Sequence, residues 1–349
     1  MKLEAEVDLA PRTTLGVGGK ALHYARVEHE AELREALTWA KSERVNVRVL
    51  GGGSNVVVAD AGFPGLVLEM AQRGVEVTER GATVLVRSAA GEPWDDFVSA
   101  MVSRGYQGLE CLSGIPGRVG ATPIQNVGAY GQDVSETIVR VVALDRTNGT
   151  ERVFDAEECR FSYRDSFFKS HEPDRFIVTE VTFRLRPGAP PAIRYAELER
   201  HFAERGQAAP SLAAVRESVI RLRRSKSMLV DPSDPNSRSC GSFFVNPILT
   251  ATELAAFEAR AAGEGELPRF PQADGRTKLS AGWLIEHAGF PRGTRDGNVG
   301  LSTKHALALV AHDGARADDI LRLAERIQSG VQARFGVRLE REPVLWAPV

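Results

Sequence analysis

Residues 112–131, LSGIPGRVGATPIQNVGAYG, are the part of the chain that folding alone does not explain. Five glycines, at positions 114, 117, 120, 128 and 131, allow positive φ and let main-chain N–H groups approach another molecule closely. The segment has no helical period and too much glycine and proline for a central strand. Ser113, Thr122, Gln125 and Asn126 offer hydroxyls and amides, which suit neutral partners and phosphate oxygens. We expect it to form one wall of a ligand site; a surface cluster of turns is the alternative.

A second glycine-rich run follows a predicted strand. Residues 45–50, VNVRVL, lead directly into GGGSN at 51–55, and VVV at 56–58 comes next. A strand that ends in three glycines with Ser and Asn is a good place for main-chain amides to meet a pyrophosphate. It is not the dinucleotide-binding fingerprint, because no GxGxxG opens a helix here. Two such runs favour a ligand site over a cluster of turns.

Length and charge bound the class of protein. The chain has 349 residues, more than one typical core, so we expect two or three domains. The formal net charge is −2 and charges of both signs are mixed along the sequence. This excludes the one-sided basic surface that a nucleic-acid-binding protein needs, so a small-molecule ligand is favoured.

The three cysteines, Cys111, Cys159 and Cys240, are far apart and lack CxxC spacing. This argues against a disulfide framework and against a metal site. The first ten residues have no apolar core for a signal peptide, and no run approaches the roughly 20 apolar residues of a membrane span. We expect a cytoplasmic protein that does not bind membranes.

Local patterns predict a mixture of helices and strands, and therefore an α+β protein. Helical spacing and stop signals predict helices at 30–44, 93–104, 211–225, 254–262, 280–287 and 315–335. Strands are predicted at 45–50, 56–58, 176–185, 305–310 and 337–340 with a tail to 346, and hairpins at 75–88 and 139–154. Arg221, Arg223 and Arg224 are interpreted as a solvated face near a helix C-terminus, where positive charge is favoured.

Four polar segments contain candidate functional side chains. Arg164 stands beside aromatic residues and can clamp a carboxylate with two N–H groups. Ser242 lies between a glycine and two phenylalanines, Lys278 precedes a helix start, and Glu340 and Glu342 lie near the chain end. Each has a structural alternative: an ion pair, a turn cap or a solvent-facing strand edge. GxSxG, HExxH and P-loop sequences are absent, so serine hydrolases, zinc proteases and NTPases have no support.

Six segments together resemble one family. They are GGGSN at 51–55, IPGRVGATPIQNVGAYG at 115–131, CRFSYRDSFFK at 159–169, GSFFVNP at 241–247, PQADGRTKLSAGWLIE at 271–286 and LERE at 339–342. In order and spacing they resemble the UDP-N-acetylenolpyruvoylglucosamine reductases, the FAD enzymes that make UDP-N-acetylmuramate for peptidoglycan. The resemblance covers essentially the whole chain. Residues 193–198, IRYAEL, match the longer subfamily, in which a tyrosine closes over the substrate.

The resemblance implies an α+β fold with three parts. Two α+β subdomains would bind FAD in the manner of vanillyl-alcohol oxidase-type flavoproteins, at 1–70, joined by a C-terminal strand at 337–349, and at 71–225. A C-terminal α/β domain at 226–336 would bind the UDP-sugar.

The resemblance also assigns site residues. The catalytic residues would be Arg164, Ser242 and Glu342; Pro343 departs from the family pattern and leaves Glu340 as a less favoured substitute for Glu342. FAD would be bound by Gly51, Gly52, Gly53, Ser54, Asn55, Ser113, Ile115, Gly117, Thr122, Gln125, Asn126, Gly128 and Tyr130. The substrate would be bound by Tyr195, Lys226, Asn246, Lys278 and His305. His305 replaces a glutamine of other members, Phe270 replaces a phosphate-contacting tyrosine of some, and Val245 replaces a lysine.

The implied reaction uses NADPH as co-substrate. Hydride would pass by way of FAD to the enolpyruvyl group, and Ser242 would supply the proton that completes the reduction. No His or Cys lies in residues 50–58, so we expect FAD to be bound non-covalently. A monomer is expected. The alternatives are a flavin-dependent sugar or alcohol oxidase on the same fold and a nucleotide-sugar-binding regulatory protein.

Overall fold

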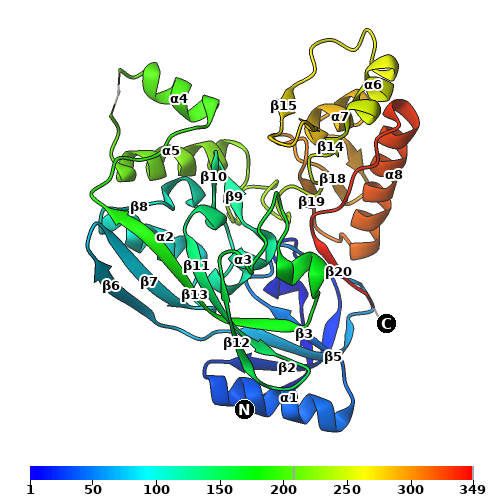
Figure 1. Ribbon diagram of the computed structural model, residues 1–349. Helices are drawn as coiled ribbons and strands as arrows, with labels where there is room; N and C mark the ends of the chain where they lie inside the picture. Colours follow the sequence, from blue (N-terminus) through cyan, green and yellow to red (C-terminus); the bar gives the residue numbers. More distant parts are fainter. Residues whose placement is uncertain (207–208, 348–349) are drawn as a thin grey trace. The chain divides into compact units, whose positions relative to one another are not determined.

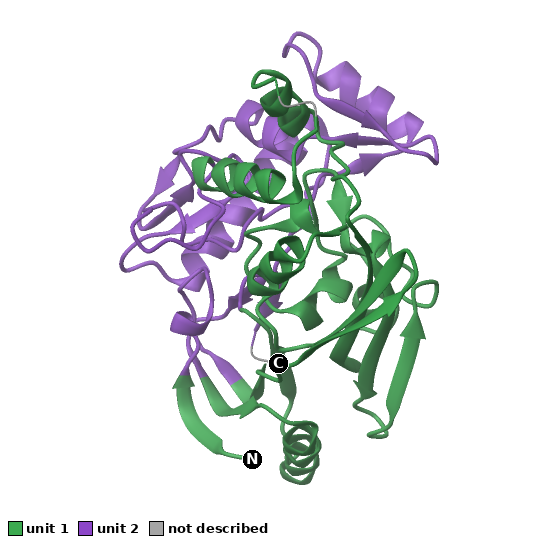
Figure 2. Ribbon diagram, turned by 90° about the vertical axis from the view of Figure 1, so that its left-hand side faces the viewer, with its two compact units in different colours: residues 1–7, 21–52, 64–225 green, residues 8–20, 53–63, 226–349 purple. Residues whose placement is uncertain are grey.

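The computed structural model describes residues 1–206 and 209–347. The chain divides into two compact units, coloured separately in Figure 2. Unit 1 contains Met1–Val7, Ala21–Gly52 and Pro64–Ser225, and unit 2 contains Asp8–Lys20, Gly53–Phe63 and the chain from Lys226 onward. The three-part division expected from the resemblance stays a prediction, and residues 348–349 of its C-terminal strand lie outside the described residues.

The first part of unit 1 is a four-stranded sheet with one helix packed on it (Figure 1). The strand order is β1 (Leu3–Asp8), β2 (Lys20–Val27), β5 (Phe63–Met70) and β3 (Val47–Leu50), with β3 parallel to β5. α1 (Glu30–Glu43) buries Leu33, Ala36 and Ala40 against Ala25 and Leu66. These three side chains share one helix face because they recur every three or four residues.

The second part of unit 1 is a six-stranded sheet. Its order is β12 (Glu151–Asp155), β11 (Ile138–Asp145), β13 (Phe176–Pro187), β7 (Thr83–Ala89) and β6 (Val75–Arg80), and β8 (Tyr106–Gln107) also pairs with β13. Both predicted hairpins are present: β6 pairs with β7 around Gly81, and β11 pairs with β12 around Gly149. The sheet buries its apolar face against α2 (Trp94–Ser103).

The rest of unit 1 consists of short elements and two helices. The segment after β8 contains 3₁₀ turns at Glu110–Leu112, Val119–Ala121 and Val134–Glu136, the single-turn helix α3 (Thr122–Gln125), and the paired β9 (Gly128–Ala129) and β10 (Gln132–Asp133). A π-helical turn follows at Phe167–His171. α4 (Ala196–Ala203) and α5 (Leu212–Ser225) bury Leu198, Phe202, Val215 and Val219 together.

Unit 2 packs its helices on two small sheets (Figure 1). The sheets are β14 (Ile248–Leu249), β16 (Thr277–Leu279) and β15 (Arg269–Pro271), and β17 (Arg295–Asp296), β18 (Val299–Leu301) and β19 (Leu309–Ala311). The helices are α6 (Ala251–Arg260), α7 (Ala281–His287) and α8 (Ala317–Phe335), with a 3₁₀ turn at Ala10–Arg12. In the described ranges no helix combines the length and the hydrophobicity that a membrane crossing requires.

The last strand of the chain pairs with a strand from its first quarter. β20 (Val344–Trp346) runs parallel to β4 (Val56–Val58), with Val344 opposite Val56 and Trp346 opposite Val58. The predicted strand at 337–340 is wrong: these residues are irregular, because the Leu339 carbonyl accepts from the Gln328 side chain at 2.8 Å.

The predicted strand at 305–310 is wrong for residues 305–308. The strand β19 starts only at Leu309. The four residues before it form a turn in which the Ala308 N–H donates to the His305 carbonyl at 3.2 Å.

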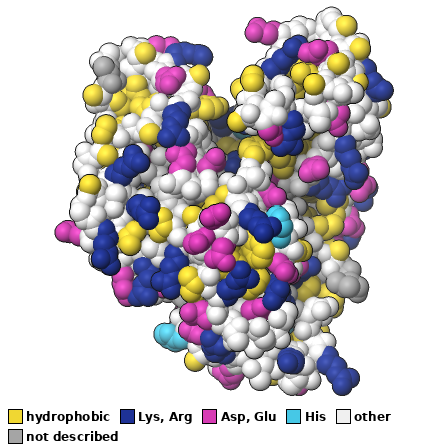
Figure 3. All heavy atoms as spheres, viewed as in Figure 1, with side chains coloured by type: hydrophobic (Ala, Val, Ile, Leu, Met, Phe, Trp, Pro, Cys, Tyr) yellow, Lys and Arg dark blue, Asp and Glu magenta, His cyan; other side chains and the backbone are white. Residues whose placement is uncertain are grey.

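Charges of both signs are interspersed over the face shown in Figure 3, as the sequence indicated.

Candidate active site

The glycine-rich segment of unit 1 is fixed by main-chain hydrogen bonds to the residues before α2. Trp94 N–H donates to the Gly117 carbonyl at 3.1 Å, and Gly120 N–H donates to the Ala90 carbonyl at 2.9 Å. A Cβ at Gly120 would lie 2.5 Å from the Ala90 Cβ, so only glycine allows this approach. The segment is therefore a rigid backbone surface rather than a loose loop.

Positive φ occurs at three of the five glycines that suggested a ligand wall. Gly114, Gly117 and Gly131 have φ values of 73°, 136° and 78°. Asn126 and Tyr130 also have positive φ, 44° and 49°. Such non-glycine residues are uncommon and concentrate at turns and functional sites, which supports the interpretation of this segment as part of a site.

The two glycine-rich runs meet inside unit 1. A Cβ added at Gly52 would lie 2.5 Å from the Gly117 Cα, so the two backbones touch. A Cβ at Gly51 would make only ordinary contacts, the nearest at 3.6 Å to Ala121. Adjacent main chain without side chains in the way is the kind of surface that accepts a pyrophosphate, so these residues fit FAD. Gly53, Ser54 and Asn55 belong to unit 2.

Arg164 contacts the same glycine-rich segment. It occupies the corner of a tight turn, φ 56°, closed by hydrogen bonds of 3.1 Å between Ser162 and Asp165 in both directions. Its Nη2 donates to the Gly128 carbonyl at 2.7 Å, and its own carbonyl accepts from Lys169 Nζ at 2.7 Å. The structure thus brings the candidate catalytic arginine to the candidate cofactor wall.

The polar side chains of the segment mostly stabilise its turns. The buried Ser113 and Thr122 hydroxyls donate to the carbonyls of Glu110 and Val119 at 2.7 and 2.8 Å. The Asn126 side chain donates to the Ser162 carbonyl at 2.7 Å and so ties the segment to the Arg164 turn. Ile115 packs against the core of the six-stranded sheet, and Gln125 ends α3.

Tyr130 and Tyr195 are neighbours in unit 1. Their rings meet edge to face with centroids 5.4 Å apart. Burial raises the pKa of Tyr130 to about 12, so this phenol stays protonated. Tyr195 is 39% exposed. The candidate substrate tyrosine therefore rests against a candidate cofactor residue.

One interpretation of the sequence is wrong here. Arg223 is not on a solvated face: its Nε donates to the Gly114 carbonyl at 3.0 Å, and burial lowers its pKa. Arg221 and Arg224, on the same helix, are exposed as expected. The local sequence gave no signal for Arg223, because its partner lies 109 residues earlier in the chain.

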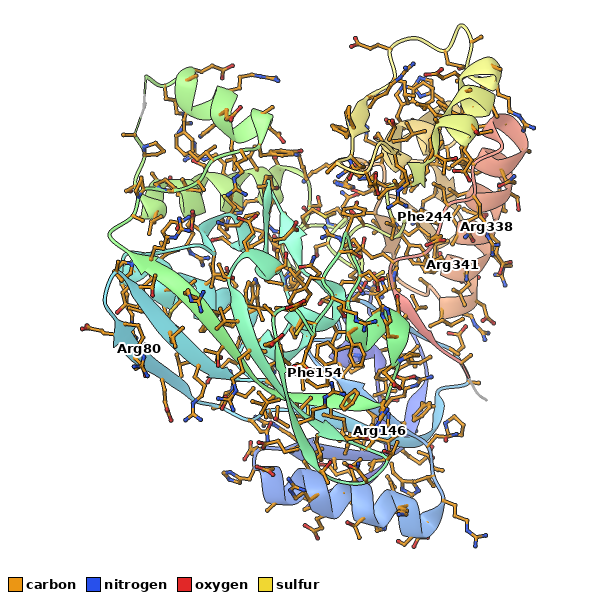
Figure 4. All side chains as sticks on the ribbon, in the orientation of Figure 1. Arg80, Arg146, Phe154, Phe244, Arg338 and Arg341 are labelled. Carbon is orange, nitrogen blue, oxygen red and sulfur yellow. The ribbon has the colours of Figure 1, made fainter. Side chains whose placement is uncertain are left out.

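In unit 2 the segments of Ser242 and Glu342 run side by side. Phe244 pairs with Arg341 in an antiparallel bridge, and both are labelled in Figure 4. Glu342 N–H donates to the Phe243 carbonyl at 2.9 Å. The Asn55 side chain donates to the Glu342 carbonyl at 3.4 Å. Main-chain hydrogen bonds thus join residues that are nearly 100 positions apart in the sequence.

The candidate substrate residues of unit 2 lie on several segments of the unit. Asn246 Oδ1 accepts from Ala281 N–H, at the start of α7, at 2.9 Å. Lys278, on β16, has its Nζ 5.8 Å from the ring centre of Phe270. His305 Nδ1 accepts from Leu307 N–H at 3.2 Å, and the Leu307 carbonyl accepts from Phe243 N–H at 2.7 Å. Lys226 begins this part of unit 2 directly after α5.

The structure therefore gathers the candidates into two groups. Arg164, Tyr195 and most of the candidate cofactor residues are in unit 1. Ser242, Glu342 and the candidates Lys226, Asn246, Lys278 and His305 are in unit 2, as are Gly53, Ser54 and Asn55.

Comparison with known proteins identifies both parts of the chain. Residues 21–155 match the family model of an FAD-binding domain. Residues 232–346 match the model described as UDP-N-acetylenolpyruvoylglucosamine reductase, C-terminal domain. The UDP-N-acetylenolpyruvoylglucosamine reductase of Thermobifida fusca (strain YX) is 50% identical over 346 residues, which cover 97% of this chain and 96% of that protein. That of Salinispora arenicola (strain CNS-205) is 48% identical over 348 residues, 98% and 95% of the two chains.

A solved structure agrees. The crystal structure of UDP-N-acetylenolpyruvylglucosamine reductase from Thermus caldophilus superposes with a TM-score of 0.69 at 28% identity, covering 99% of this chain and 100% of that one. Together, the fold and the glycine-lined surface define a flavin-binding oxidoreductase. The chain belongs to the UDP-N-acetylenolpyruvoylglucosamine reductase family. The fold class expected from the sequence, α+β with an FAD-binding part and a C-terminal domain, is confirmed.

Proposed function

We propose that this protein reduces the enolpyruvyl group of UDP-N-acetylglucosamine enolpyruvate to give UDP-N-acetylmuramate, with FAD as cofactor and NADPH as co-substrate. The product serves peptidoglycan synthesis, and through it cell shape and division. The observation that carries the proposal is 50% identity to a reductase of this name over 97% of the chain. The contact of the two glycine-rich runs at Gly52 and Gly117 supports the cofactor.

FAD, held by the two glycine-rich runs, would supply the transfer of hydride from NADPH to the terminal carbon of the enolpyruvyl group. In this proposal Arg164 binds the substrate carboxylate and stabilises the negative charge that develops there. Its carbonyl is held by Lys169 and its guanidinium rests on Gly128, so its position is fixed before substrate arrives. Such preorganisation lowers the barrier because the dipoles need not rearrange during the reaction.

Ser242 gives a proton to the carbon that bears the carboxylate, which completes the reduction. A serine hydroxyl is a weak acid, so a nearby cation such as Lys226, or a chain of waters, must stabilise the alkoxide. Glu342 acts as the second acid at the carboxylate oxygens. The pairing of residues 243–245 with 340–342 supports this division of roles, because it holds both segments in one place.

Cys240 is two residues from Ser242 but is a poor candidate for proton transfer. Burial is the main reason that the pKa of its thiol is raised to about 12. Cys111, Cys159 and Cys240 are free and buried. Free thiols fit a reducing, cytoplasmic setting. We further propose that the enzyme is a monomer, and that it holds FAD non-covalently because no His or Cys lies in residues 50–58.

The test separates the two half-reactions. We expect Ser242→Ala to keep flavin reduction by NADPH and to lose reoxidation by substrate by roughly three orders of magnitude, a barrier increase of about 4 kcal/mol. Stopped-flow absorbance at the flavin band measures both steps. Ser233→Ala, at an exposed serine of the same unit, is the control and should change neither. An equal loss in both half-reactions would refute the role of Ser242, and a colourless protein would refute the proposed function.

A further inference from the structure

The main chain of Gly114 is held on both sides by charged side chains of neighbouring helices in unit 1. Its N–H donates to Asp95 Oδ1, on α2, at 2.5 Å. Its carbonyl accepts from Arg223 Nε, on α5, at 3.0 Å. Gly114 has a φ of 73°, so a left-handed residue is fixed at the entrance of the candidate cofactor segment.

Asp95 is itself fixed. Arg216, also on α5, binds its two carboxylate oxygens at 2.6 and 2.9 Å, the bidentate geometry that gives strong, directional ion pairs. Burial alone would raise the pKa of Asp95, but the hydrogen bonds from Arg216 and Gly114 outweigh it and the pKa is lowered. The carboxylate is therefore charged at neutral pH, and the N–H side of Gly114 has a permanent acceptor.

The helix that carries Arg223, α5, also contacts Tyr130. Tyr130 packs against the apolar cluster that contains Val215 and Val219 of the same helix. Tyr130 in turn meets the Tyr195 ring, and a Cβ at Gly131 would lie 3.2 Å from the Arg194 Cβ. The helix α5 thus contacts the start of the candidate cofactor segment through Arg223 and packs in one cluster with Tyr130, the neighbour of the candidate substrate tyrosine.

We propose that Arg223 is a positioning residue of the flavin site: its Nε–H fixes the Gly114 carbonyl and with it the course of residues 113–117. This rests on the proposed function, because residues 113–117 belong to the expected FAD surface. Arg223 acts through the backbone of Gly114, so the donor at the Nε position matters more than the charge. Most of the effect is on FAD binding, and a smaller one reaches the substrate through Tyr130 and Tyr195.

Two substitutions separate the donor from the charge. Glutamine has its Nε2 at the position of the arginine Nε, so Arg223→Gln keeps an N–H donor and loses the charge. Methionine has a methyl group there, so Arg223→Met keeps the length of the chain up to that position, as glutamine does, and loses both the donor and the charge. Arg224→Met, at the exposed neighbour on the same helix, is the matched control.

The readouts are the Kd for FAD from flavin fluorescence, the visible absorbance spectrum of the bound flavin, and kcat and KM for the enolpyruvyl sugar nucleotide. We expect Arg223→Met to bind FAD roughly tenfold to a hundredfold more weakly, the usual effect of losing a hydrogen bond from a charged donor. Arg223→Gln should recover most of this affinity and the spectrum, with KM raised more than kcat is lowered. Arg224→Met should match the unaltered protein.

Equal loss in the Gln and Met variants would overturn the proposal, since charge or helix packing would then be responsible. Wild-type affinity in Arg223→Met would overturn it too. Circular dichroism of the apoproteins checks that the variants fold; if Arg223→Met does not, the Gln variant against the Arg224→Met control still decides. An unaltered protein that binds no FAD would instead contradict the proposed function itself.

Discussion

Gly52 and Gly117 illustrate what a glycine does at the scale of one residue. The two backbones approach so closely that a Cβ on Gly52 would lie 2.5 Å from the Gly117 Cα, and backbone cannot move aside as a flexible side chain can. Gly51, its neighbour, has no such contact, with the nearest atom at 3.6 Å. The sequence GGG does not distinguish these positions, but the structure does.

We therefore expect Gly52→Ala to destabilise the apoprotein by about 1–3 kcal/mol, the usual range for overpacking, and to weaken FAD binding. Gly51→Ala is the control and should change the free energy of unfolding by less than about 0.5 kcal/mol. Urea unfolding of the apoproteins gives the stability, and FAD titration gives the affinity. Equal stability of the two variants would mean that the runs do not touch in solution.

The candidate site residues were partly predictable from the sequence. Arg164 could be proposed because it stands in a distinctive segment, and the structure puts it against Gly128. Arg223 could not, because arginine near a helix C-terminus has a sufficient local explanation. Its contact with Gly114 depends on how α5 packs beside residues 110–114, which no local pattern encodes.

At the scale of one element, α8 shows how far a helix cap can lie from its helix. Asp60 Oδ1 and Oδ2 accept from the N–H groups of Ala317 and Asp318 at 2.9 and 3.0 Å. The sequence predicted α8 from its periodicity. The cap of α6 is local, because Thr250 and Glu253 of the same segment form it. The Asp60 cap is 257 residues away from Ala317, so it could not be predicted.

We expect Asp60→Ala to lower the free energy of unfolding by about 1–2 kcal/mol, the usual cost of a lost N-cap. Burial raises the pKa of Asp60, but hydrogen bonds from Asp318, Ala317 and Arg316 outweigh it and the pKa is lowered. The stabilisation is thus present above the unfolded pKa of about 3.9 and is lost as pH falls through the lower folded value.

Urea unfolding followed by circular dichroism, at a series of pH values from about 7 to about 3, measures this difference. The gap between the unaltered protein and Asp60→Ala should narrow below pH ~4. Asp313→Ala, at a fully exposed carboxylate paired with Arg238, is the control. A gap of constant size across the range would show that Asp60 acts by packing and not by charge.

The incorrect strand at 337–340 has an equally physical cause. Val337 and Leu339 are buried and alternate with polar residues, which is the pattern of a strand. In the structure the Gln328 side chain, on α8, donates a hydrogen bond to the Leu339 carbonyl. Its Oε1 accepts from Arg341 Nε at 3.2 Å. A side chain thus replaces the neighbouring strand as far as Leu339. Main-chain pairing begins at Glu340, whose carbonyl accepts from Val245 N–H at 3.0 Å, and the strand β20 begins at Val344.

At the scale of the whole molecule, unit 2 is assembled from three separate pieces of chain. Residues 8–20 and 53–63 join the C-terminal part, and their Leu15, Val17 and Val57 share one core with α7 and α8. Composition and length predicted more than one domain, and the resemblance implied a returning C-terminal strand. Which early residues this strand meets follows only from the fold, where β20 lies on β4.

The closure of unit 2 depends on Trp346. Its side chain is 5% exposed and lies 6.1 Å from the Phe63 ring centre to centre, and its carbonyl accepts from Ala59 N–H at 2.9 Å. We expect Trp346→Ala to lower the free energy of unfolding by about 3–5 kcal/mol, because it leaves a large cavity beside Phe63. Leu345→Ala, at the next side chain of the same strand, 38% exposed, should cost much less.

Hydrogen exchange measured by mass spectrometry distinguishes the units in these variants. In Trp346→Ala, the amides of β4 and of residues 241–246 should lose protection from exchange. The reason is that β4 pairs with residues 344–346 and residues 241–246 pair with residues 340–342. The strands β7, β11 and β13 of unit 1 should keep their protection. Reoxidation by substrate should fall more than FAD binding, since Glu342 lies in the released segment and the Gly52–Gly117 contact does not. Uniform loss of protection in both units, or unchanged protection of β4, would contradict this dependence on the chain end.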